Sequence, residues 1–212
     1  MVINNSKILF SQLISETARR SKFPARIMFE LTYRCNFHCL HCYVFNNKKK
    51  KELSTSQIKK VLDQLKVAGC YHIGFTWGEV FLRQDIFEVL EYAKSCGFII
   101  SILTNGYLID EKVAQKLSAL GNSLNRVDVS VLGANEKTFE KITGVKGSYN
   151  RVIKAIRLLK QAGICVQIKA TLLNLNKDEF LSIKRMAEEL GVVFRYTLSL
   201  FARVDGNKNP LK

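Results

Sequence analysis

Three cysteines close together in the sequence are the residues of this chain best suited to chemistry. They lie in the stretch Cys-Asn-Phe-His-Cys-Leu-His-Cys, which places them at Cys35, Cys39 and Cys42. Thiolates at this spacing can hold one metal centre. A structural zinc site takes four Cys or His ligands, and an iron–sulfur cube ordinarily takes four cysteines. The fourth position is therefore either filled from elsewhere or left open for chemistry.

The rest of the sequence repeats a unit of helix, glycine and strand. Five glycines stand where a helix C-cap is expected, and a short β-branched run follows each of them. These are Gly69, Gly97, Gly121, Gly163 and Gly191. Together with one earlier run, the expected strands are 27–33, 73–76, 98–104, 127–131, 165–172 and 192–200.

Capping residues mark the expected helix starts between these strands. Most of them have a Gln or Glu three residues later, as in a capping box. The expected starts are Ser54 with Gln57, Asp85 with Glu88, Ser148, and Asn176 with Glu179. The apolar positions that follow each start fall on one helix face, as in helices that pack against a sheet.

Strands that alternate with helices at this spacing predict an α/β fold with parallel strands. Right-handed crossovers would curl six such strands into a partial TIM barrel of the (β/α)6 type. Functional loops of such a barrel follow the carboxyl ends of the strands, and the cysteine triad follows the first strand. Cys70, Cys96 and Cys165 lie at strand starts, about 17–20 Å from that end. We expect these three to be ordinary buried or half-buried thiols.

Polar side chains recur on one face of several expected strands. Period-two alternation groups Glu30 and Thr32, Asp128 and Ser130, Gln167, Lys169 and Thr171, and Arg195, Thr197 and Ser199. A closed eight-stranded barrel fills its centre with branched hydrophobic residues. A polar interior on six strands therefore predicts a cavity for a polar ligand. The alternative is a self-contained network, for instance Lys169 paired with Asp128 or Glu30.

Several motifs, in order and at strand ends, resemble those of one known family. The spacing Cys-x-x-x-Cys-x-x-Cys after a first strand resembles the cluster loop of the radical S-adenosylmethionine (radical SAM) enzymes. Residues 75–83 resemble that family's Gly-Gly-Glu-Pro segment, and residues 103–106 and 129–133 resemble its later stretches. The resemblance covers about residues 24–200. Residues 31–35 and 144–148 resemble the SPASM-type branch of peptide maturases and haem-biosynthesis enzymes.

The resemblance implies two cofactors. Cys35, Cys39 and Cys42 would hold a 4Fe–4S cluster whose fourth iron is chelated by S-adenosylmethionine. One electron would cleave that molecule and give a 5′-deoxyadenosyl radical, which abstracts hydrogen from the substrate. An electron donor such as a flavodoxin or ferredoxin is implied as well.

The resemblance also implies residue roles at the cofactor. Gly78 and Glu79 would meet the methionine amino group, Ser130 the ribose, and the backbone at His41 the adenine. Tyr43 and Asn105 would line the same wall. By their charge alone, Lys169 and Arg34 are candidates for the carboxylate or the anionic cluster, or else for ordinary salt bridges.

Three residues depart from the family pattern. Trp77 replaces the first glycine of the Gly-Gly-Glu-Pro segment, Val80 replaces its proline, and Leu132 stands where an aspartate is usual. A glycine at the first of these positions lets backbone approach a ligand closely. The indole of Trp77 must therefore point elsewhere or narrow the pocket.

The length of 212 residues suits one core domain, expected over 26–212, after a lead-in helix around 8–20 within residues 1–25. The C-terminal cysteine-rich extension common in the SPASM-type branch is not expected within these residues, because no cysteine follows Cys165. The chain is then either a minimal enzyme or part of a longer or split system. Unpaired thiols and an iron–sulfur site favour a reducing cytoplasm. No stretch is apolar enough for a membrane span.

The net charge of the chain indicates which kinds of substrate or binding partner suit it. Thirty-three Lys and Arg against 18 Asp and Glu give a net charge of +15, with a run of four lysines at 48–51. This balance suits an acidic peptide or an anionic small molecule such as a tetrapyrrole. The lysine run lacks interleaved aromatic residues, which favours a solvated face over a nucleic-acid site.

Modification of a peptide by a radical SAM enzyme is the function that these features favour, with a step in haem or tetrapyrrole biosynthesis as the alternative. A zinc-binding interaction module would use the three cysteines with His38 or His41, but it leaves Glu79 and the polar interior without a role. A degenerate core that only scaffolds a partner is the third interpretation. Trp77 and Leu132 are the residues that favour it.

Overall fold

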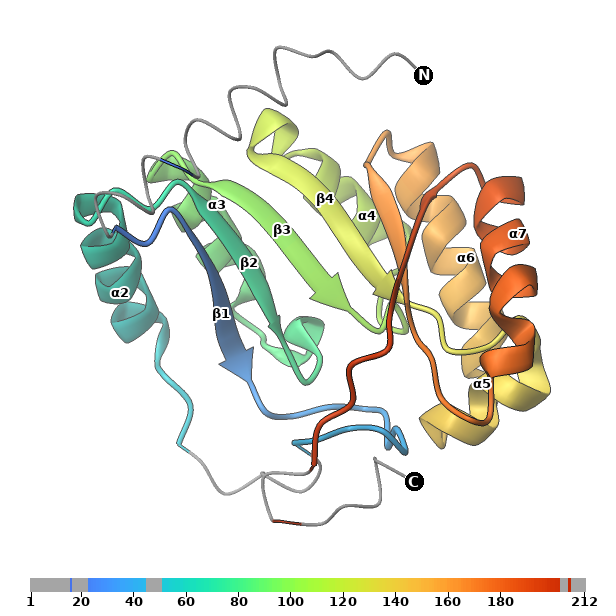
Figure 1. Cartoon of the computed structure of the whole chain (residues 1–212). Helices are drawn as coiled ribbons and strands as arrows, with labels where there is room; N and C mark the ends of the chain where they lie inside the picture. Colours follow the sequence, from blue (N-terminus) through green and yellow to red (C-terminus); the bar gives the residue numbers. More distant parts are fainter. Residues whose placement is uncertain (1–15, 17–22, 45–50, 203–205, 207–212) are drawn as a thin grey trace.

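Six parallel strands form one open, curved sheet. The computed structural model describes residues 16, 23–44, 51–202 and 206. The strands lie in chain order from β1 to β6, each paired in parallel with the next. β1 and β6 are the two edges of the sheet, and helices cover its outer face (Figure 1). The predicted (β/α)6 partial TIM barrel is confirmed.

The strands match the expected runs to within one to three residues at most ends. They are β1 (Arg26–Thr32), β2 (His72–Trp77), β3 (Ile99–Thr104), β4 (Leu124–Ser130), β5 (Val166–Thr171) and β6 (Val193–Thr197). The helices are α2 (Thr55–Val67), α3 (Ile86–Ser95), α4 (Glu111–Ser118), α5 (Glu136–Thr143), α6 (Ser148–Gln161) and α7 (Phe180–Glu189). Short 3-10 turns η1 (Val80–Leu82), η2 (Gly121–Ser123) and η3 (Lys177–Glu179) complete the order. α5 had no counterpart among the expected helices.

The core lies between the sheet and its helices. The outward residues of the inner strands are β-branched or aromatic and fully buried, as a sheet covered by helices requires. Ile73, Phe75, Ile100, Ile102 and Val129 are examples, each with no exposed surface. The inner, concave face of the sheet carries the polar residues.

The first helix start was predicted correctly. The Ser54 hydroxyl accepts from the backbone N–H of Gln57, and the Gln57 side chain accepts from the backbone N–H of Ser54. This reciprocal pair is a capping box. Gly69 then takes a positive φ of 84° directly after the last turn of α2. The glycine therefore ends the helix as its position in the sequence indicates.

Two other capping predictions were wrong. Asp85 stands at the start of α3 but makes no cap there, because its carboxylate binds the Arg83 guanidinium and the Thr55 hydroxyl instead. Asn176 precedes η3, and α7 begins only at Phe180. The amide of Asn176 donates to the Leu132 and Thr171 carbonyl oxygens, which leaves it joining the ends of β4 and β5.

Glu179 bridges two crossover segments. Its carboxylate accepts from the backbone N–H of Ala134 at 2.6 Å, from the Asn135 amide at 2.8 Å, and from the Thr138 hydroxyl. These donors surround the first turn of α5, where a negative charge is favourable. Glu179 was expected to help cap the helix that became α7, and it instead stabilises the start of α5.

The remaining expectations concern the other three cysteines, the lead-in helix, the lysine run and membrane spans. Cys70, Cys96 and Cys165 lie just before β2, at the end of α3 and just before β5, away from the cysteine triad, as predicted. Cys165 is exposed, however, so the expectation that all three are at least half-buried was wrong for it. The lead-in helix and the lysine run fall outside the described residues, apart from Glu16 and Lys51. Within the described ranges, no helix has both the length and the apolar character that crossing a membrane requires.

Replacing Glu179 by alanine should destabilise the fold, because it removes the acceptor that joins α7 to α5. Hydrogen bonds to a charged group contribute about 1.5–3 kcal/mol, so the free energy of unfolding in urea should fall by about that amount. Glu189→Ala, at an exposed position at the end of α7, is the matched control. Equal stability of the two variants would contradict the bridging role.

Candidate active site

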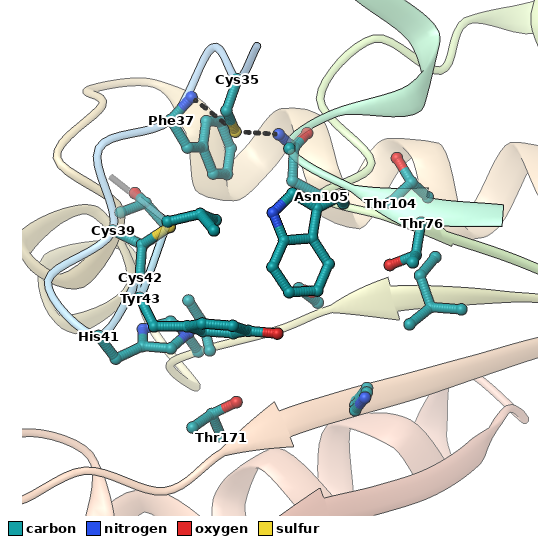
Figure 2. Close-up of a pocket in the computed structure, with 18 of the residues that line it drawn as sticks. Cys35, Phe37, Cys39, His41, Cys42, Tyr43, Thr76, Thr104, Asn105 and Thr171 are labelled. Carbon is teal, nitrogen blue, oxygen red and sulfur yellow. Dashed lines mark hydrogen bonds between the residues drawn. The ribbon is translucent and has the colours of Figure 1, made fainter. Parts of the chain in front are cut away.

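A cavity of about 440 Å³ opens at the carboxyl ends of the strands. The loop that carries the cysteine triad lines it together with residues from β1 to β5. Figure 2 shows the triad and its neighbours on one side and Thr171 of β5 across from them. The cavity expected inside the sheet is therefore present, next to the triad. Polar residues of β1, β4 and β5 line it as predicted, but Gln167 and the expected polar residues of β6 do not, and much of the wall is apolar.

The cysteine loop is tied to the rest of the fold by backbone hydrogen bonds. The N–H groups of His38 and Leu40 donate to the carbonyl oxygens of Thr143 and Ile142, both at 2.9 Å. The loop therefore rests on the end of α5. This explains why a helix that the sequence pattern did not indicate matters for the site.

The three thiols differ in their surroundings. Cys35 accepts from the Phe37 backbone N–H at 3.4 Å and from the Asn105 amide at 3.8 Å, both drawn in Figure 2. Burial is the main reason that the pKa of Cys35 and that of Cys39 are raised, and neighbouring negative charges raise them further. Buried thiolates with little water around them need a positively charged partner, which an iron–sulfur cluster would supply.

Among the described residues, no three His, Cys, Asp or Glu side chains gather around a point that one metal ion could occupy. A single zinc ion needs its thiolates about 2.3 Å away from it. A cube places its cysteines on different irons, so they need not converge on one point. The zinc alternative therefore stays a prediction that metal analysis can test.

A tight turn after β2 brings the motif at 77–79 against the cysteine loop. Trp77 has a φ of 103°, a left-handed value that is rare outside glycine. The next two N–H groups, of Gly78 and Glu79, donate to the carbonyl oxygens of Thr32 at 3.0 Å and Arg34 at 2.8 Å. A Cβ at Gly78 would lie 2.1 Å from the Arg34 carbonyl oxygen. Glycine is required here by close backbone approach.

Glu79 is buried behind the cavity wall with no exposed surface. Its carboxylate accepts from the Thr104 hydroxyl at 2.8 Å, the Asn105 N–H at 2.8 Å and the Phe81 N–H at 3.1 Å. Burial raises the pKa of Glu79 to about 7, although these hydrogen bonds act in the opposite direction. Its expected contact with a cofactor stays a prediction, and its present partners are the ends of β2 and β3.

Asn105 links Glu79 to the triad. Its side-chain amide donates to the Cys35 thiol and, at 2.8 Å, to the side-chain Oδ1 of Asn36, while its backbone N–H donates to the Glu79 carboxylate. Thr104, which had no assigned role, supplies the hydroxyl in this chain of contacts. Thr104 stands directly before Asn105 at the carboxyl end of an expected strand, and this position could have indicated a role at the site.

Ser130 and Lys169 lie opposite each other in the register of β4 and β5, and both line the cavity. The expected pairing of Lys169 with Asp128 or Glu30 is not found. The Asp128 carboxylate accepts from Arg126 and Gln167 instead, at 2.8 and 2.9 Å. Among the described residues Lys169 has no ion-pair partner. Its ammonium group therefore remains available to an anionic ligand.

His41 and Tyr43 also line the cavity, and their expected contact with the adenine stays a prediction. Burial lowers the pKa of His41 to about 4, so its ring is neutral at physiological pH, and the buried Nδ1 has no hydrogen-bond partner among the described residues. The Tyr43 ring packs edge-to-face on the Trp77 indole, with centroids 4.8 Å apart. Trp77 thus lines and narrows the pocket.

Other predicted residues lie elsewhere or serve the fold. Arg34 is outside this cavity and pairs with Glu52 at 3.5 Å. Thr32 shares no face with Glu30, because a register shift separates them, and its hydroxyl donates to Glu52. Leu132 lines the cavity, where its side chain replaces the usual aspartate. Val80 is fully buried in the 3-10 turn after Glu79.

Comparison with known proteins agrees with this geometry. The family model described as the radical SAM superfamily matches residues 29–187, which is most of the chain. The chain belongs to the radical SAM superfamily. This superfamily implies an iron–sulfur cluster and S-adenosylmethionine, and it is a superfamily of enzymes.

Curated relatives of this radical SAM chain come from two branches. An AdoMet-dependent heme synthase of Methanosarcina barkeri is 30% identical over 188 residues, covering 88% of this chain and 53% of the relative. The mycofactocin maturase MftC of Mycolicibacterium smegmatis is also 30% identical over 188 residues, covering 88% and 47%. The chain therefore spans about half the length of the curated relatives it matches.

Solved radical SAM structures share the fold. SuiB of Streptococcus suis superposes with a TM-score of 0.75 at 17% identity, over 98% of this chain and 48% of SuiB. SuiB is also known bound to S-adenosylmethionine and to its precursor peptide SuiA. At this identity the likeness establishes the open barrel of parallel strands.

Gly78→Ala should disturb the turn that joins β2 to the cysteine loop. Forcing extra atoms into a packed site costs about 1–3 kcal/mol or more, and here the clash is with backbone. We expect a lower melting temperature and reduced cluster content after reconstitution. Ser130→Ala, at another strand end, is the control, and equal cluster content and stability in both variants would refute the packing argument.

The buried carboxyl of Glu79 should make stability depend on pH. Its pKa is raised from 4.5 to about 7, so between these values the folded state holds a proton that the unfolded chain releases. Stability should therefore fall as pH rises through this window, by up to about 1.4 kcal/mol per pH unit. Urea unfolding of wild type and Glu79→Gln across the window measures this. If the free energy of unfolding changes with pH in the same way in both proteins, Glu79 is not the group that titrates in this window.

Proposed function

We propose that this chain is a radical SAM enzyme that modifies a peptide. The observation that carries the proposal is the cysteine triad at the end of β1, held beside a polar cavity at the ends of β1 to β5. The triad supplies three ligands for a 4Fe–4S cluster. The cavity next to it offers room for S-adenosylmethionine, which would complete the coordination of the fourth iron. When bound, the cluster and S-adenosylmethionine supply a 5′-deoxyadenosyl radical for hydrogen abstraction.

The chain's own residues position these groups. Cys35, Cys39 and Cys42 hold the cluster, and the Asn105 amide donates to Cys35, which lowers the basicity of that thiolate. Glu79 fixes Asn105 through its backbone N–H. A fixed donor beside a cluster thiolate tunes the cluster's reduction potential.

The cavity wall supplies contacts for S-adenosylmethionine. We assign the methionine end to Gly78 and its turn, the ribose to Ser130, and the adenine side to His41 and Tyr43. The Lys169 ammonium group offers a charge-assisted hydrogen bond to a carboxylate. The aromatic and apolar parts of the wall exclude water from the reacting atoms.

Relatives support a peptide as the substrate. The maturase MftC, the subtilosin biosynthesis protein AlbA of Bacillus subtilis at 30% identity, and SuiB with its precursor peptide are all named for peptide products or partners. The net charge of +15 suits an acidic peptide. A reducing protein such as a flavodoxin or ferredoxin would deliver the electron.

Tetrapyrrole chemistry is the second candidate. Two relatives from Methanosarcina barkeri favour it, the heme synthase and an Fe-coproporphyrin III synthase that is 34% identical over 191 residues. An anionic tetrapyrrole would also suit the positive charge of the chain. The two candidates differ in what should stimulate cofactor cleavage.

Loss of any triad cysteine should abolish the cluster. We expect about one 4Fe–4S cluster in wild type after anaerobic reconstitution, and none in Cys35→Ala, Cys39→Ala or Cys42→Ala. The controls are Cys70→Ala, Cys96→Ala and Cys165→Ala, which should keep it. Iron and acid-labile sulfide content is the measurement. Stoichiometric zinc without sulfide in wild type would overturn the enzyme proposal in favour of a zinc-binding module.

The reduced wild-type protein should form 5′-deoxyadenosine slowly without substrate and faster with the right one. We expect precursor peptides of the maturase type to increase the rate, as measured by chromatography under anaerobic conditions. Stimulation by iron porphyrins alone would favour the tetrapyrrole candidate. A protein that holds the cluster but never forms 5′-deoxyadenosine would be a scaffold.

A further inference from the structure

Trp77 is the residue of the cavity whose conformation is least expected. It is the single tryptophan of the chain, and it has a φ of 103°. No other non-glycine residue in the described part of the chain has a positive φ. Such a conformation is unfavourable for a residue with a side chain and persists only where its surroundings hold it in place. A large ring in a position suited to glycine therefore needs a reason.

The Trp77 indole is fixed beside the cysteine loop. Trp77 pairs in register with Thr32, three residues before the first cysteine, and its ring packs on Tyr43, which follows the last cysteine. Tyr43 in turn contacts Phe201, after β6, with ring centroids 5.7 Å apart. These contacts run between the two edges of the open sheet. They hold the indole, which lines the cavity, against Tyr43 of the loop that carries the triad.

The N–H of the Trp77 indole has no hydrogen-bond partner. Its Nε1 atom is buried, and no acceptor for it is present among the described residues. Buried polar groups in folded proteins are nearly always paired, so an unpaired buried donor on a ring that lines the cavity calls for an explanation. A ligand with an acceptor near the cysteine loop would pair it.

We propose that Trp77 binds the methionine end of S-adenosylmethionine, with the indole N–H donating a hydrogen bond to the carboxylate. This inference rests on the proposed function and adds a binding residue that is specific to this chain. The carboxylate is the acceptor of that molecule expected next to the cluster. The ring that narrows the pocket thereby supplies a contact that a glycine has no side chain to make.

Two substitutions at Trp77 separate the contribution of the indole hydrogen bond to ligand binding from the effect of the ring's volume. Trp77→Phe keeps an aromatic ring against Tyr43 but removes the N–H. Trp77→Gly removes the ring and relieves the backbone strain, so it should fold. Both should retain the cluster, which iron and sulfide analysis checks before any binding measurement. Equilibrium dialysis of the reconstituted proteins then gives the dissociation constants for S-adenosylmethionine and for 5′-methylthioadenosine, which lacks the carboxylate.

Trp77→Phe should weaken S-adenosylmethionine binding by about tenfold to a hundredfold, as expected for loss of one hydrogen bond to a charged group. Binding of 5′-methylthioadenosine should stay the same. Trp77→Gly should also bind S-adenosylmethionine more weakly than wild type. In wild type, the fluorescence of this single tryptophan should change as S-adenosylmethionine, but not 5′-methylthioadenosine, is added.

Three results would overturn the inference. Unchanged affinity in Trp77→Phe would make Trp77 a packing residue for Tyr43. Tighter binding in Trp77→Gly would mean that the indole crowds the pocket. Equal weakening for both ligands would place the ring at the adenosine end. If wild type holds a cluster but binds no S-adenosylmethionine, the proposed function itself fails, which separates that outcome from the other three.

Discussion

The close approach of two backbone segments holds the site together. The turn after β2 donates hydrogen bonds from Gly78 and Glu79 to the carbonyl oxygens that precede the cysteine loop. The space between them excludes even a Cβ at Gly78. Because both segments follow parallel neighbouring strands, the pairing of β1 with β2 brings them together. The cysteine loop and the turn after β2 are thereby packed together at one corner of the cavity.

A buried carboxylate extends this corner to the third strand. Glu79 holds the hydroxyl of Thr104 and the backbone N–H of Asn105, and the amide of Asn105 reaches Cys35. Burying an acid is unfavourable unless its oxygens are paired, and here several donors converge on them. The position of Cys35 therefore depends on residues from the ends of β2 and β3. The packing of the two strand ends and the position of Cys35 therefore depend on the same contacts.

The fold and most of the cavity could be predicted from local pattern. Glycine at helix ends, β-branched runs and the capping box at Ser54 depend on neighbours in the sequence, and the structure agrees with them. Predictions that depended on where a side chain points were less successful. Asp85, Asn176 and Glu179 have the right types for helix caps, but partners distant in sequence compete for them. The strained conformation of Trp77 also follows from tertiary contacts, and no local pattern indicates it.

The central claim is that three cysteines hold a 4Fe–4S cluster and leave its fourth iron open to S-adenosylmethionine. Mössbauer spectroscopy of protein reconstituted with iron-57 tests this most directly, because it resolves individual irons. The account predicts that adding S-adenosylmethionine changes the isomer shift of one iron of the cluster and leaves the others as they were. A spectrum that does not change on addition, from a cluster with all its irons equivalent, would contradict the account.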